Sequence, residues 1–364
     1  MDFIIRFINA ASRPEYSVTA ATFLLFGTLF HRPTRERVYT VKGGLLALAG
    51  FIAFYAVSLL NPNFYAVVAK PDNIPITIMI IVMGGGFWTS MVQAVANDKR
   101  VREGRPVYEA DEDGRRKAWV WPDLVYVEFL ATILMTVFLV VWAVVFKAPL
   151  EEPASPALTP NPSKAPWYFL GLQEMLVYFD PWIAGVVFPG LIIMGFIAVP
   201  YIDVGPKGNG YYTFEERKYA IAVFLYGFLV LWGMMIVIGT FFRGPNWNIF
   251  GPYEYWDIHK LEALTNVNLS EYFWVWLLGQ GLPKNALVRE IPGFALIGAY
   301  FVVLPGLLAR TIFRDFYDKM GPTRYAIGVF LFLSMASLPI KMYMRWSPLN
   351  LKYIISIPEW FFNI

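Results

Sequence analysis

The chain has 364 residues, of which 57% are hydrophobic and 16% are charged, and its formal net charge is +3. Soluble domains carry roughly a quarter charged residues, so this composition excludes an ordinary water-soluble protein and indicates an integral membrane protein. We expect membrane lipid as its surroundings and no nucleic-acid partner. The absence of cysteine excludes disulfides, iron–sulfur ligands and covalent haem attachment on this chain.

Eight long apolar runs follow one another along the chain. Most of them reach the roughly 20 residues that a helix needs to cross a bilayer. The first run is short, and the last one contains Pro339. We therefore predict an all-α integral membrane protein with about eight transmembrane helices, at residues 16–31, 39–60, 76–96, 121–146, 182–202, 219–242, 291–313 and 324–343.

The distribution of basic residues predicts the orientation. The loops 32–42, 97–118, 203–218 and 310–324 hold 18 of the 30 Lys and Arg residues. With eight helices these loops lie on one side of the membrane, and cytoplasmic loops are enriched in Lys and Arg. We predict a multi-pass protein of a bacterial cytoplasmic membrane with both termini on the periplasmic side.

Changes in composition divide the chain into four regions. The first holds three helices that dock a partner or have an unknown role, and the second is a charged cytoplasmic loop. The third holds three helices, and the fourth holds an outer loop, two more helices and an interfacial C-terminus. Their predicted bounds are residues 1–96, 97–118, 119–256 and 257–364.

The connector at residues 147–181 separates the first two helices of the third region. It begins with a proline-rich stretch, which favours extended chain over helix. Residues 166–179 are apolar and aromatic but too short to span, which is typical of a short amphipathic helix in the membrane interface. Residues 353–364, with Trp360, predict a second interfacial helix at the C-terminus.

Histidine limits the metal chemistry of the chain. His31 and His259 are the two histidines, and the predicted topology places them at opposite faces of the membrane. They cannot jointly hold one haem, so we expect no haem bound by this chain alone. The sequence also offers no zinc or di-iron ligand set.

Two acidic residues lie at predicted membrane depth, where burying an ionisable group is costly. Glu128 follows the start of the fourth predicted span, and Glu174 lies among apolar neighbours in the connector helix. Burial penalises the charged form of a carboxyl, which suits a group that exchanges protons near neutral pH. The alternative for both residues is a side chain that reaches out to the headgroups.

Three motifs make the third region resemble the C-terminal half of cytochrome b, known as subunit IV where that protein is split. Trp121-Pro122-Asp123-Leu124-Val125-Tyr126 opens a span, Ala165-Pro166-Trp167-Tyr168 falls where the family has Pro-Glu-Trp-Tyr, and Phe242-Arg243-Gly244-Pro245-Asn246-Trp247 follows the third helix. The run 164–203 is most similar to the version in bacterial menaquinol:cytochrome c reductases. The resemblance covers about residues 120–256.

The resemblance implies that the connector is the lid of an outer quinol-oxidation site. The motif's glutamate, the expected proton acceptor, is Pro166 here, so that role does not carry over. We predict that Glu174 replaces it and that Tyr168 contacts the quinone head. The other predicted quinone-site residues are Trp167, Phe169 and Leu172 at the outer site and Asp123 and Glu128 at an inner one.

The function implied is that of one haem-free subunit of a quinol:cytochrome c oxidoreductase, which couples electron transport to proton translocation. Quinol is its substrate. Haem b, an iron–sulfur centre and haem c are expected on partner chains: a haem-bearing cytochrome b N-terminal subunit, a Rieske-type protein and a cytochrome c. Two alternatives stay open, a structural subunit without its own active site and a transporter.

Overall fold

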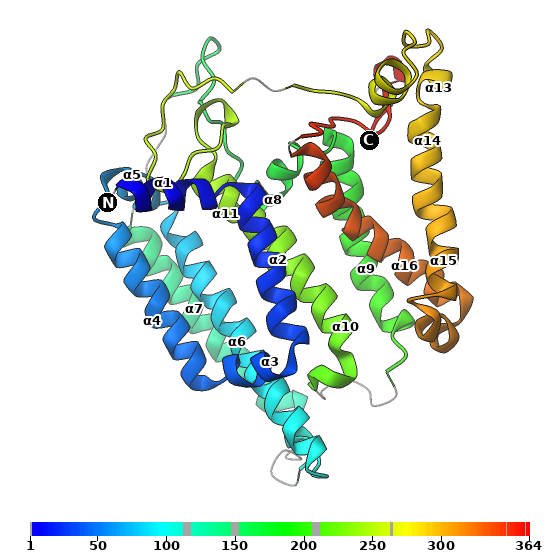
Figure 1. Ribbon diagram of the computed structural model, residues 1–364. Helices are drawn as coiled ribbons and strands as arrows, with labels where there is room; N and C mark the ends of the chain where they lie inside the picture. Colours follow the sequence, from blue (N-terminus) through cyan, green and yellow to red (C-terminus); the bar gives the residue numbers. More distant parts are fainter. Residues whose placement is uncertain are drawn as a thin grey trace.

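The computed structural model describes residues 2–111, 118–146, 153–205, 212–262, 265–346, 348–360 and 362–364. Parts of the predicted charged loop and of the connector, residues 112–117 and 147–152, lie outside the described residues. The described chain is mostly helical, with few strand residues (Figure 1). Its helices and strands are α1 (Asp2–Ala11), α2 (Pro14–Phe30), α3 (Arg32–Val38), α4 (Val41–Ser58), α5 (Pro62–Val68), α6 (Ile74–Arg102), α7 (Val125–Val145), α8 (Trp167–Met175), α9 (Phe188–Ile202), α10 (Phe214–Leu225), α11 (Met234–Val237), α12 (Leu269–Glu271), α13 (Ala286–Arg289), α14 (Ile291–Gly298), α15 (Leu304–Arg310), α16 (Arg314–Arg345), β1 (Ser356–Ile357) and β2 (Phe362–Asn363).

Long apolar helices confirm the predicted all-α membrane architecture. Several of them join two labelled helices through wide π-helical turns, such as Tyr226–Gly233 between α10 and α11. The first predicted span, residues 16–31, is α2, a helix of 17 residues at the lower limit of length for crossing a bilayer. Among the described residues, seven helices are long and apolar enough to span: Val41–Ser58, Ile74–Arg102, Val120–Val145, Ile183–Ile202, Phe214–Phe242, Ile291–Arg310 and Arg314–Arg345.

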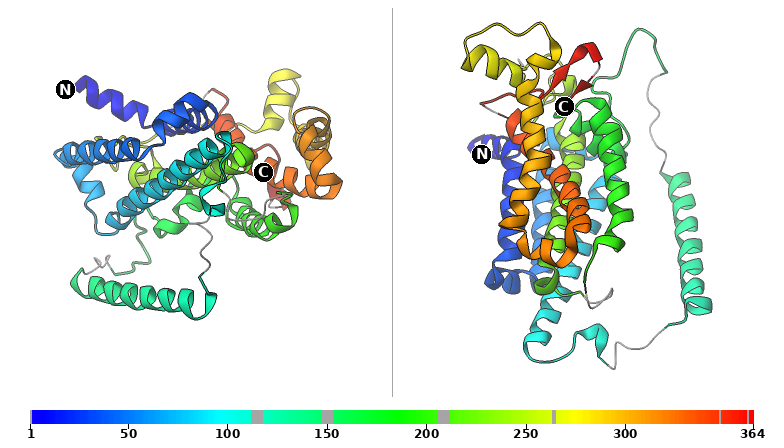
Figure 2. Two further views of the ribbon diagram at one scale, coloured as in Figure 1. Left: turned by 90° about the horizontal axis from the view of Figure 1, so that it is seen from below. Right: turned by 90° about the vertical axis from the view of Figure 1, so that its right-hand side faces the viewer.

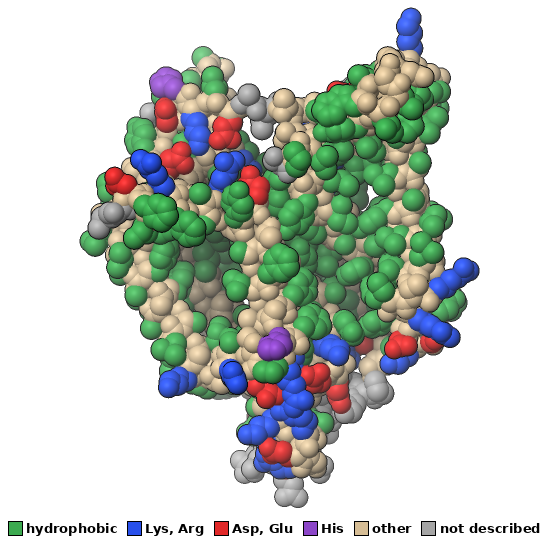
Figure 3. Space-filling view, viewed as in Figure 1, with side chains coloured by type: hydrophobic (Ala, Val, Ile, Leu, Met, Phe, Trp, Pro, Cys, Tyr) green, Lys and Arg blue, Asp and Glu red, His purple; other side chains and the backbone are tan. Residues whose placement is uncertain are grey.

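The helices run between two ends of a bundle. Both termini lie at the upper end in Figure 1, and α2 crosses the bundle beside the longer spans. The short helix α3, the start of α10 and the turn between α15 and α16 lie at the lower end. Apolar side chains cover the middle of the surface, and charged ones gather at the ends (Figure 3). This arrangement agrees with eight alternating crossings, while the membrane side of each end stays a prediction.

The span Phe214–Phe242 lies at the centre of the bundle. It packs against α2, α6, α8 and α16. Met235, Ile236 and Ile238 from this span are at most 1% exposed. The core of the protein therefore surrounds this helix.

The span Val120–Val145 stands apart from the rest of the chain. Figure 2 shows α7 separated from the bundle in both views. Every described residue from 119 to 141 is exposed. The motif Trp121 to Tyr126 begins this span. None of its residues is buried by another part of the described chain.

The last span bends near its start. Gly321 has a φ of 74°, a left-handed conformation that glycine adopts without the steric cost that a side chain brings. Pro322 follows and lacks a backbone N–H donor. The predicted span 324–343 begins after this bend, and Pro339 stays inside the helix.

The described residues of the C-terminal segment form a hairpin around a short 3-10 turn, Pro358–Trp360, so the predicted interfacial helix at residues 353–364 was wrong. β1 and β2 pair as antiparallel strands through Ser356 with Asn363 and Ile357 with Phe362. Pro358 follows β1 and cannot donate a helical hydrogen bond. The isoleucines before it are β-branched, which favours extended chain. A hairpin that folds back on itself results.

Candidate functional site

The connector helix α8 confirms the predicted short helix. Pro166 precedes it in an extended conformation, with φ −50° and ψ 148°. The side chain of Gln173 accepts a hydrogen bond from the Ala165 N–H at 2.8 Å and donates one to the Ser163 carbonyl at 2.8 Å. The helix therefore holds the extended chain before it in a fixed position.

The two faces of α8 differ. Leu170, Gly171, Glu174 and Met175 are buried, because α8 packs against α11 and the turn Ile238–Phe242. A Cβ atom on Gly171 would lie 3.2 Å from the Trp232 ring, so glycine permits this close packing.

The aromatic start of α8 points away from the core. Trp167, Tyr168 and Phe169 are 38%, 49% and 51% exposed. Leu172 is half-buried and packs against the core. The structure thus brings three of the predicted quinone-contacting residues together on an exposed aromatic surface, with Glu174 buried behind them.

Glu174 forms a buried ion pair with Arg243. The carboxylate is 0% exposed and accepts two hydrogen bonds, at 2.9 Å from Arg243 Nε and at 2.6 Å from Nη2. Arg243 also donates to the Trp247 carbonyl at 2.7 Å. Two-pronged pairing of this kind is the strongest form of arginine–carboxylate contact. The pair joins the connector helix to the end of the third helix of the matching region.

Arg243 is a residue that the sequence reasoning missed. It stands in the Phe242-Arg243-Gly244-Pro245 motif, to which no role was given. A buried acid in an apolar helix needs a cation nearby, which predicts a partner for Glu174 but not which residue it is. Because both carboxylate oxygens accept from Arg243, the pair holds α8 firmly to the end of the buried span.

A second cation fixes the start of the connector. Lys164 donates from Nζ to the Thr240 carbonyl at 2.7 Å, and its ammonium lies 4.8 Å from the centre of the Trp256 ring. Burial, with a smaller contribution from Lys70, lowers the pKa of Lys164 to about 7. Lys164 lies before α8 and Glu174 lies near its end. Both residues contact the end of the span Phe214–Phe242, through Thr240 and Arg243.

The structure does not bring Asp123 and Glu128 to this site. Both lie on the separate span Val120–Val145 and are exposed. Within the part of the chain that is described, neither carboxylate forms a hydrogen bond or an ion pair. Their predicted place at an inner quinone site stays a prediction.

The two histidines lie far from each other. His31 follows α2 at one end of the bundle, where Nδ1 lies 2.7 Å from the Thr34 hydroxyl. His259 belongs to the loop at the other end, and its backbone N–H donates to Asp257. The two lie at opposite ends of the bundle (Figure 3), so they do not fit a shared haem.

Another buried charge cluster escaped the sequence reasoning. Arg35 on α3 is 2% exposed and forms an ion pair with Glu215 at the start of α10. Asp98 on α6 lies 3.9 Å from the same guanidinium and accepts a hydrogen bond from the Glu215 N–H at 3.2 Å. The cluster ties three helices together at the end of the bundle opposite to α8.

The chain also contains a Pro-Glu-Trp triplet at Pro358–Trp360. Glu359 is paired with Arg289 at 3.2 Å. This hairpin lies near the end of the connector, because Asn363 donates to Asp180 at 3.0 Å and Phe362 packs on Trp182. The sequence reasoning assigned no role to the triplet.

Comparisons with known proteins agree with the resemblance seen in the sequence. The family model described as cytochrome b(C-terminal)/b6/petD matches residues 153–243. A menaquinol:cytochrome c reductase cytochrome c subunit of Geobacillus thermodenitrificans is 32% identical over 92 residues. That match covers 24% of this chain and 37% of the relative's length. No solved structure matches the chain.

The matched segment begins in the connector and ends at Arg243. It contains α8, both anchors of the connector and both partners of the buried ion pair. Residues 153–243 of this multi-pass, all-α membrane protein are thus the part that is similar to the cytochrome b C-terminal family.

Proposed function

We propose that this chain is one membrane subunit of a quinol:cytochrome c oxidoreductase of the cytochrome bc type and that it carries no haem of its own. The observation that carries the proposal is the family match over residues 153–243, which includes the buried pair between Glu174 and Arg243. The relative from Geobacillus, a menaquinol:cytochrome c reductase subunit, favours menaquinol as the substrate.

The proposed outer quinol site lies at α8. Trp167, Tyr168 and Phe169 offer exposed aromatic surface, which suits a flat apolar ring. Tyr168 contacts the quinone head through its hydroxyl, and Leu172 supports the surface from behind. Glu174 accepts a quinol proton when Arg243 releases one of its oxygens. Asp123 and Glu128 on the separate span are the proposed inner-site residues.

The exposed span Val120–Val145 is the argument for a partner subunit that packs against it. A helix without any buried residue in its most apolar stretch gains no stability from packing in this chain. A haem-bearing cytochrome b N-terminal subunit is the proposed neighbour, with a Rieske-type protein and a cytochrome c completing electron transfer. Residues 119–256 are the proposed unit of cytochrome b type, between residues 1–96 and 257–364. The proposed location is a bacterial inner membrane, with both termini on the periplasmic side.

A second candidate function is a structural subunit that keeps this fold without an active site. The pairing of Glu174 with Arg243 favours it, because both oxygens of the carboxylate serve to join α8 to the end of the buried span. Pro166 in place of the motif's glutamate points the same way. Nothing in the described residues favours a transporter, since no charged pair lies in the middle of a span.

The first test is purification of the tagged chain from its native membrane, followed by a reduced-minus-oxidised spectrum with decylquinol as reductant. We expect haem b bands that appear on quinol addition, contributed by a co-purifying partner. A preparation without any haem protein contradicts the proposal.

The variant Glu174→Gln then separates the two candidates. If Glu174 accepts the proton, quinol oxidation per haem slows, whatever the haem content of the purified complex. If the residue is only structural, haem content and turnover fall together and turnover per haem is unchanged. Gln173→Glu is unsuitable as a control because Gln173 holds Ser163 and Ala165. Glu359→Gln, a paired but half-exposed carboxylate, is the matched control.

A further inference from the structure

Residues 272–282 form an uncharged projection at the end of the bundle that carries both termini. The segment follows α12 directly, begins with a wide helical turn, Tyr272–Leu277, and continues to Leu282. Figure 2 shows this helix running across the ends of the spans rather than along them. It contains no Lys, Arg, Asp or Glu from Tyr272 to Leu282.

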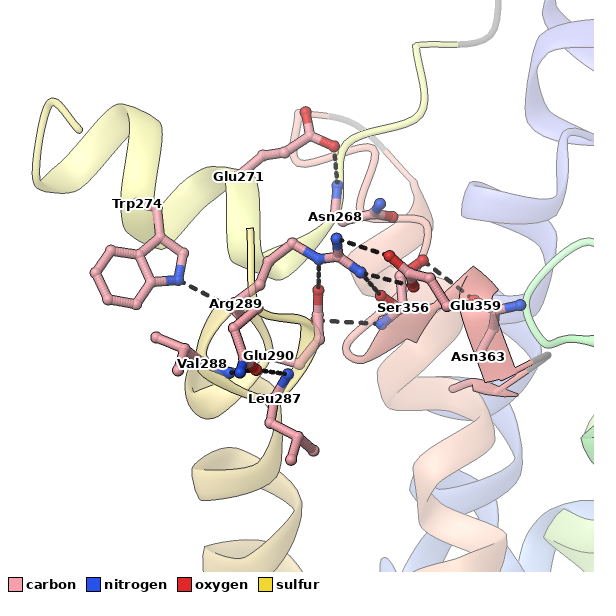
Figure 4. Close-up of polar contacts among 11 residues, drawn as sticks. Asn268, Glu271, Trp274, Leu287, Val288, Arg289, Glu290, Ser356, Glu359 and Asn363 are labelled. Carbon is pink, nitrogen blue, oxygen red and sulfur yellow. Dashed lines mark hydrogen bonds and ion pairs between the residues drawn. The ribbon is translucent and has the colours of Figure 1, made fainter. Parts of the chain in front are cut away.

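Polar contacts hold one side of this segment to the protein. Asn268 and Glu271 form a capping box at its start, and the Leu269 N–H donates to the Tyr353 carbonyl at 3.0 Å. Trp274 donates from Nε1 to the Arg289 carbonyl at 2.9 Å (Figure 4). The segment is therefore fixed in orientation, with Trp274 directed toward the protein.

Arg289 is itself held by a network that includes the C-terminal hairpin. Its guanidinium donates to Glu290 at 3.0 Å and to the Ser356 carbonyl at 3.1 Å (Figure 4). Glu290 is 1% exposed and accepts the Ser356 N–H at 3.1 Å. Because Arg289 also pairs with Glu359, the network joins the base of the projection to β1 and to the start of α14.

The residues that follow Trp274 are apolar and uncovered. We name as the apolar ledge the five residues whose exposed fractions are 42% to 72%: Val275, Trp276, Leu277, Leu278 and Leu282. The exposed residues Leu287, Val288 and Ile291 lead along the chain from the ledge into the span Ile291–Arg310. Because Trp274 donates to the carbonyl of Arg289, two residues before this span, the ledge lies close to the point where the span enters the membrane.

We propose that the apolar ledge lies in the membrane at the headgroup–acyl boundary of the leaflet on the side of the termini. Helices that lie in this boundary run along the membrane plane and bury an apolar face with Trp and Leu. Water is a poor neighbour for eleven consecutive uncharged residues of this composition. The exposed residues Val275 to Leu278 are all apolar, whereas an interface with a water-soluble partner typically mixes apolar and polar side chains.

The absence of cysteine in the chain permits a direct test by spin labelling. A single nitroxide is placed at Leu277→Cys in the full chain, reconstituted in lipid nanodiscs, and its collisions with dissolved oxygen and with a water-soluble nickel chelate are compared. Oxygen concentrates in lipid and the chelate stays in water. We expect collisions with oxygen to dominate at this position.

Two further positions calibrate the measurement. Val302→Cys, 75% exposed on the span Ile291–Arg310, gives the value for lipid, and Lys284→Cys, in the exposed loop after the ledge, gives the value for water. The ratio of oxygen to chelate collisions at Leu277→Cys should fall between these two and nearer to Val302→Cys. A ratio equal to that at Lys284→Cys overturns the proposal. A label shielded from both reagents also overturns it, since protein then covers the ledge.

Discussion

Two spans of almost equal hydropathy occupy very different places in this molecule. The most apolar stretch of Val120–Val145 has a mean hydropathy of 2.4, and that of Phe214–Phe242 has 2.5. In the first, 0% of the residues are buried inside the protein, and in the second 56% are. Hydropathy therefore predicts that a segment enters the membrane but not what it contacts there.

Small residues account for much of the difference. Helices in membranes approach one another through glycine and other small residues. Phe214–Phe242 contains Gly227, Gly233 and Gly239, and a Cβ atom at each would lie 3.2 to 3.4 Å from a side chain of another helix. Val120–Val145 contains no glycine. Its surface suits looser contact with lipid or with a partner that supplies the small residues.

The largest expected effect comes from the ion pair at the end of the buried span. Arg243→Gln leaves the Glu174 carboxylate buried without its cation, and breaking a buried pair in this way costs about 3–5 kcal/mol. We expect the free energy of unfolding in mixed micelles, measured by SDS titration, to fall by this amount.

The double variant Arg243→Gln with Glu174→Gln serves as the control. It removes both charges, so it should regain most of the lost stability, and the difference between single and double variants measures the coupling. Equal losses in the single and double variants would contradict the role of charge in this pair.

The next prediction compares the two spans directly. Ile236 is 0% exposed in the buried span, and Leu134 is 71% exposed in the separate one. Ile236→Ala removes buried methyl groups and should cost about 2–5 kcal/mol. Leu134→Ala should change the free energy of unfolding of the isolated chain by less than about 0.5 kcal/mol.

The same two variants test for the proposed partner. In the purified complex, a partner packed on Val120–Val145 gives Leu134→Ala an effect that the isolated chain does not show, measured as haem retained per chain after detergent washing. If Leu134→Ala were as costly as Ile236→Ala in the isolated chain, the separation of α7 would be wrong.

Lys164 extends the comparison to pH. Its pKa falls from 10.5 to about 7 in the folded protein because of burial. Below pH 7 the lysine is charged in both states, so the cost of burying the charge is present in full. Between pH 7 and 10.5 the unfolded chain binds the extra proton, and stability rises with pH.

Lys164→Met should therefore have a higher unfolding temperature than the wild type, and the difference should be largest near pH 6 and smaller toward pH 9. The lost hydrogen bond to Thr240 adds an offset that does not depend on pH. Lys284→Met, in an exposed loop, is the matched control. A difference between wild type and Lys164→Met that stays constant over this range would contradict the prediction.

The sequence predicted the spans and the connector helix because both depend on local composition. Runs of about 20 apolar residues specify a spanning helix without reference to any partner, and residues 166–179 follow a proline-rich stretch that a helix cannot include. The C-terminal hairpin was missed because its aromatic residues resemble those of an interfacial helix. Its strands are held by contacts with each other and by the hydrogen bond from Ser356 to Glu290, which lies 66 positions before Ser356.

The site was predictable only in part. Trp167 and Tyr168 could be placed on one short helix from their spacing. The pairing of Glu174 with Arg243 joins residues 69 positions apart, and a single sequence carries no signal for which cation a buried acid meets. The separation of Asp123 and Glu128 from the connector likewise depends on how helices pack, which hydropathy does not report.

The smallest expected effect completes the comparison of buried and exposed regions. Arg314 and Asp318 also form an arginine–carboxylate pair, at 3.9 Å, but their side chains are 74% and 64% exposed. Water screens such a pair and holding two long side chains costs entropy, so exposed pairs contribute about 0–1 kcal/mol. Asp318→Asn should therefore leave the unfolding midpoint almost unchanged, whereas Arg243→Gln lowers it strongly. Because the two pairs share their chemistry, equal effects would mean that burial does not set the strength of the Glu174–Arg243 pair.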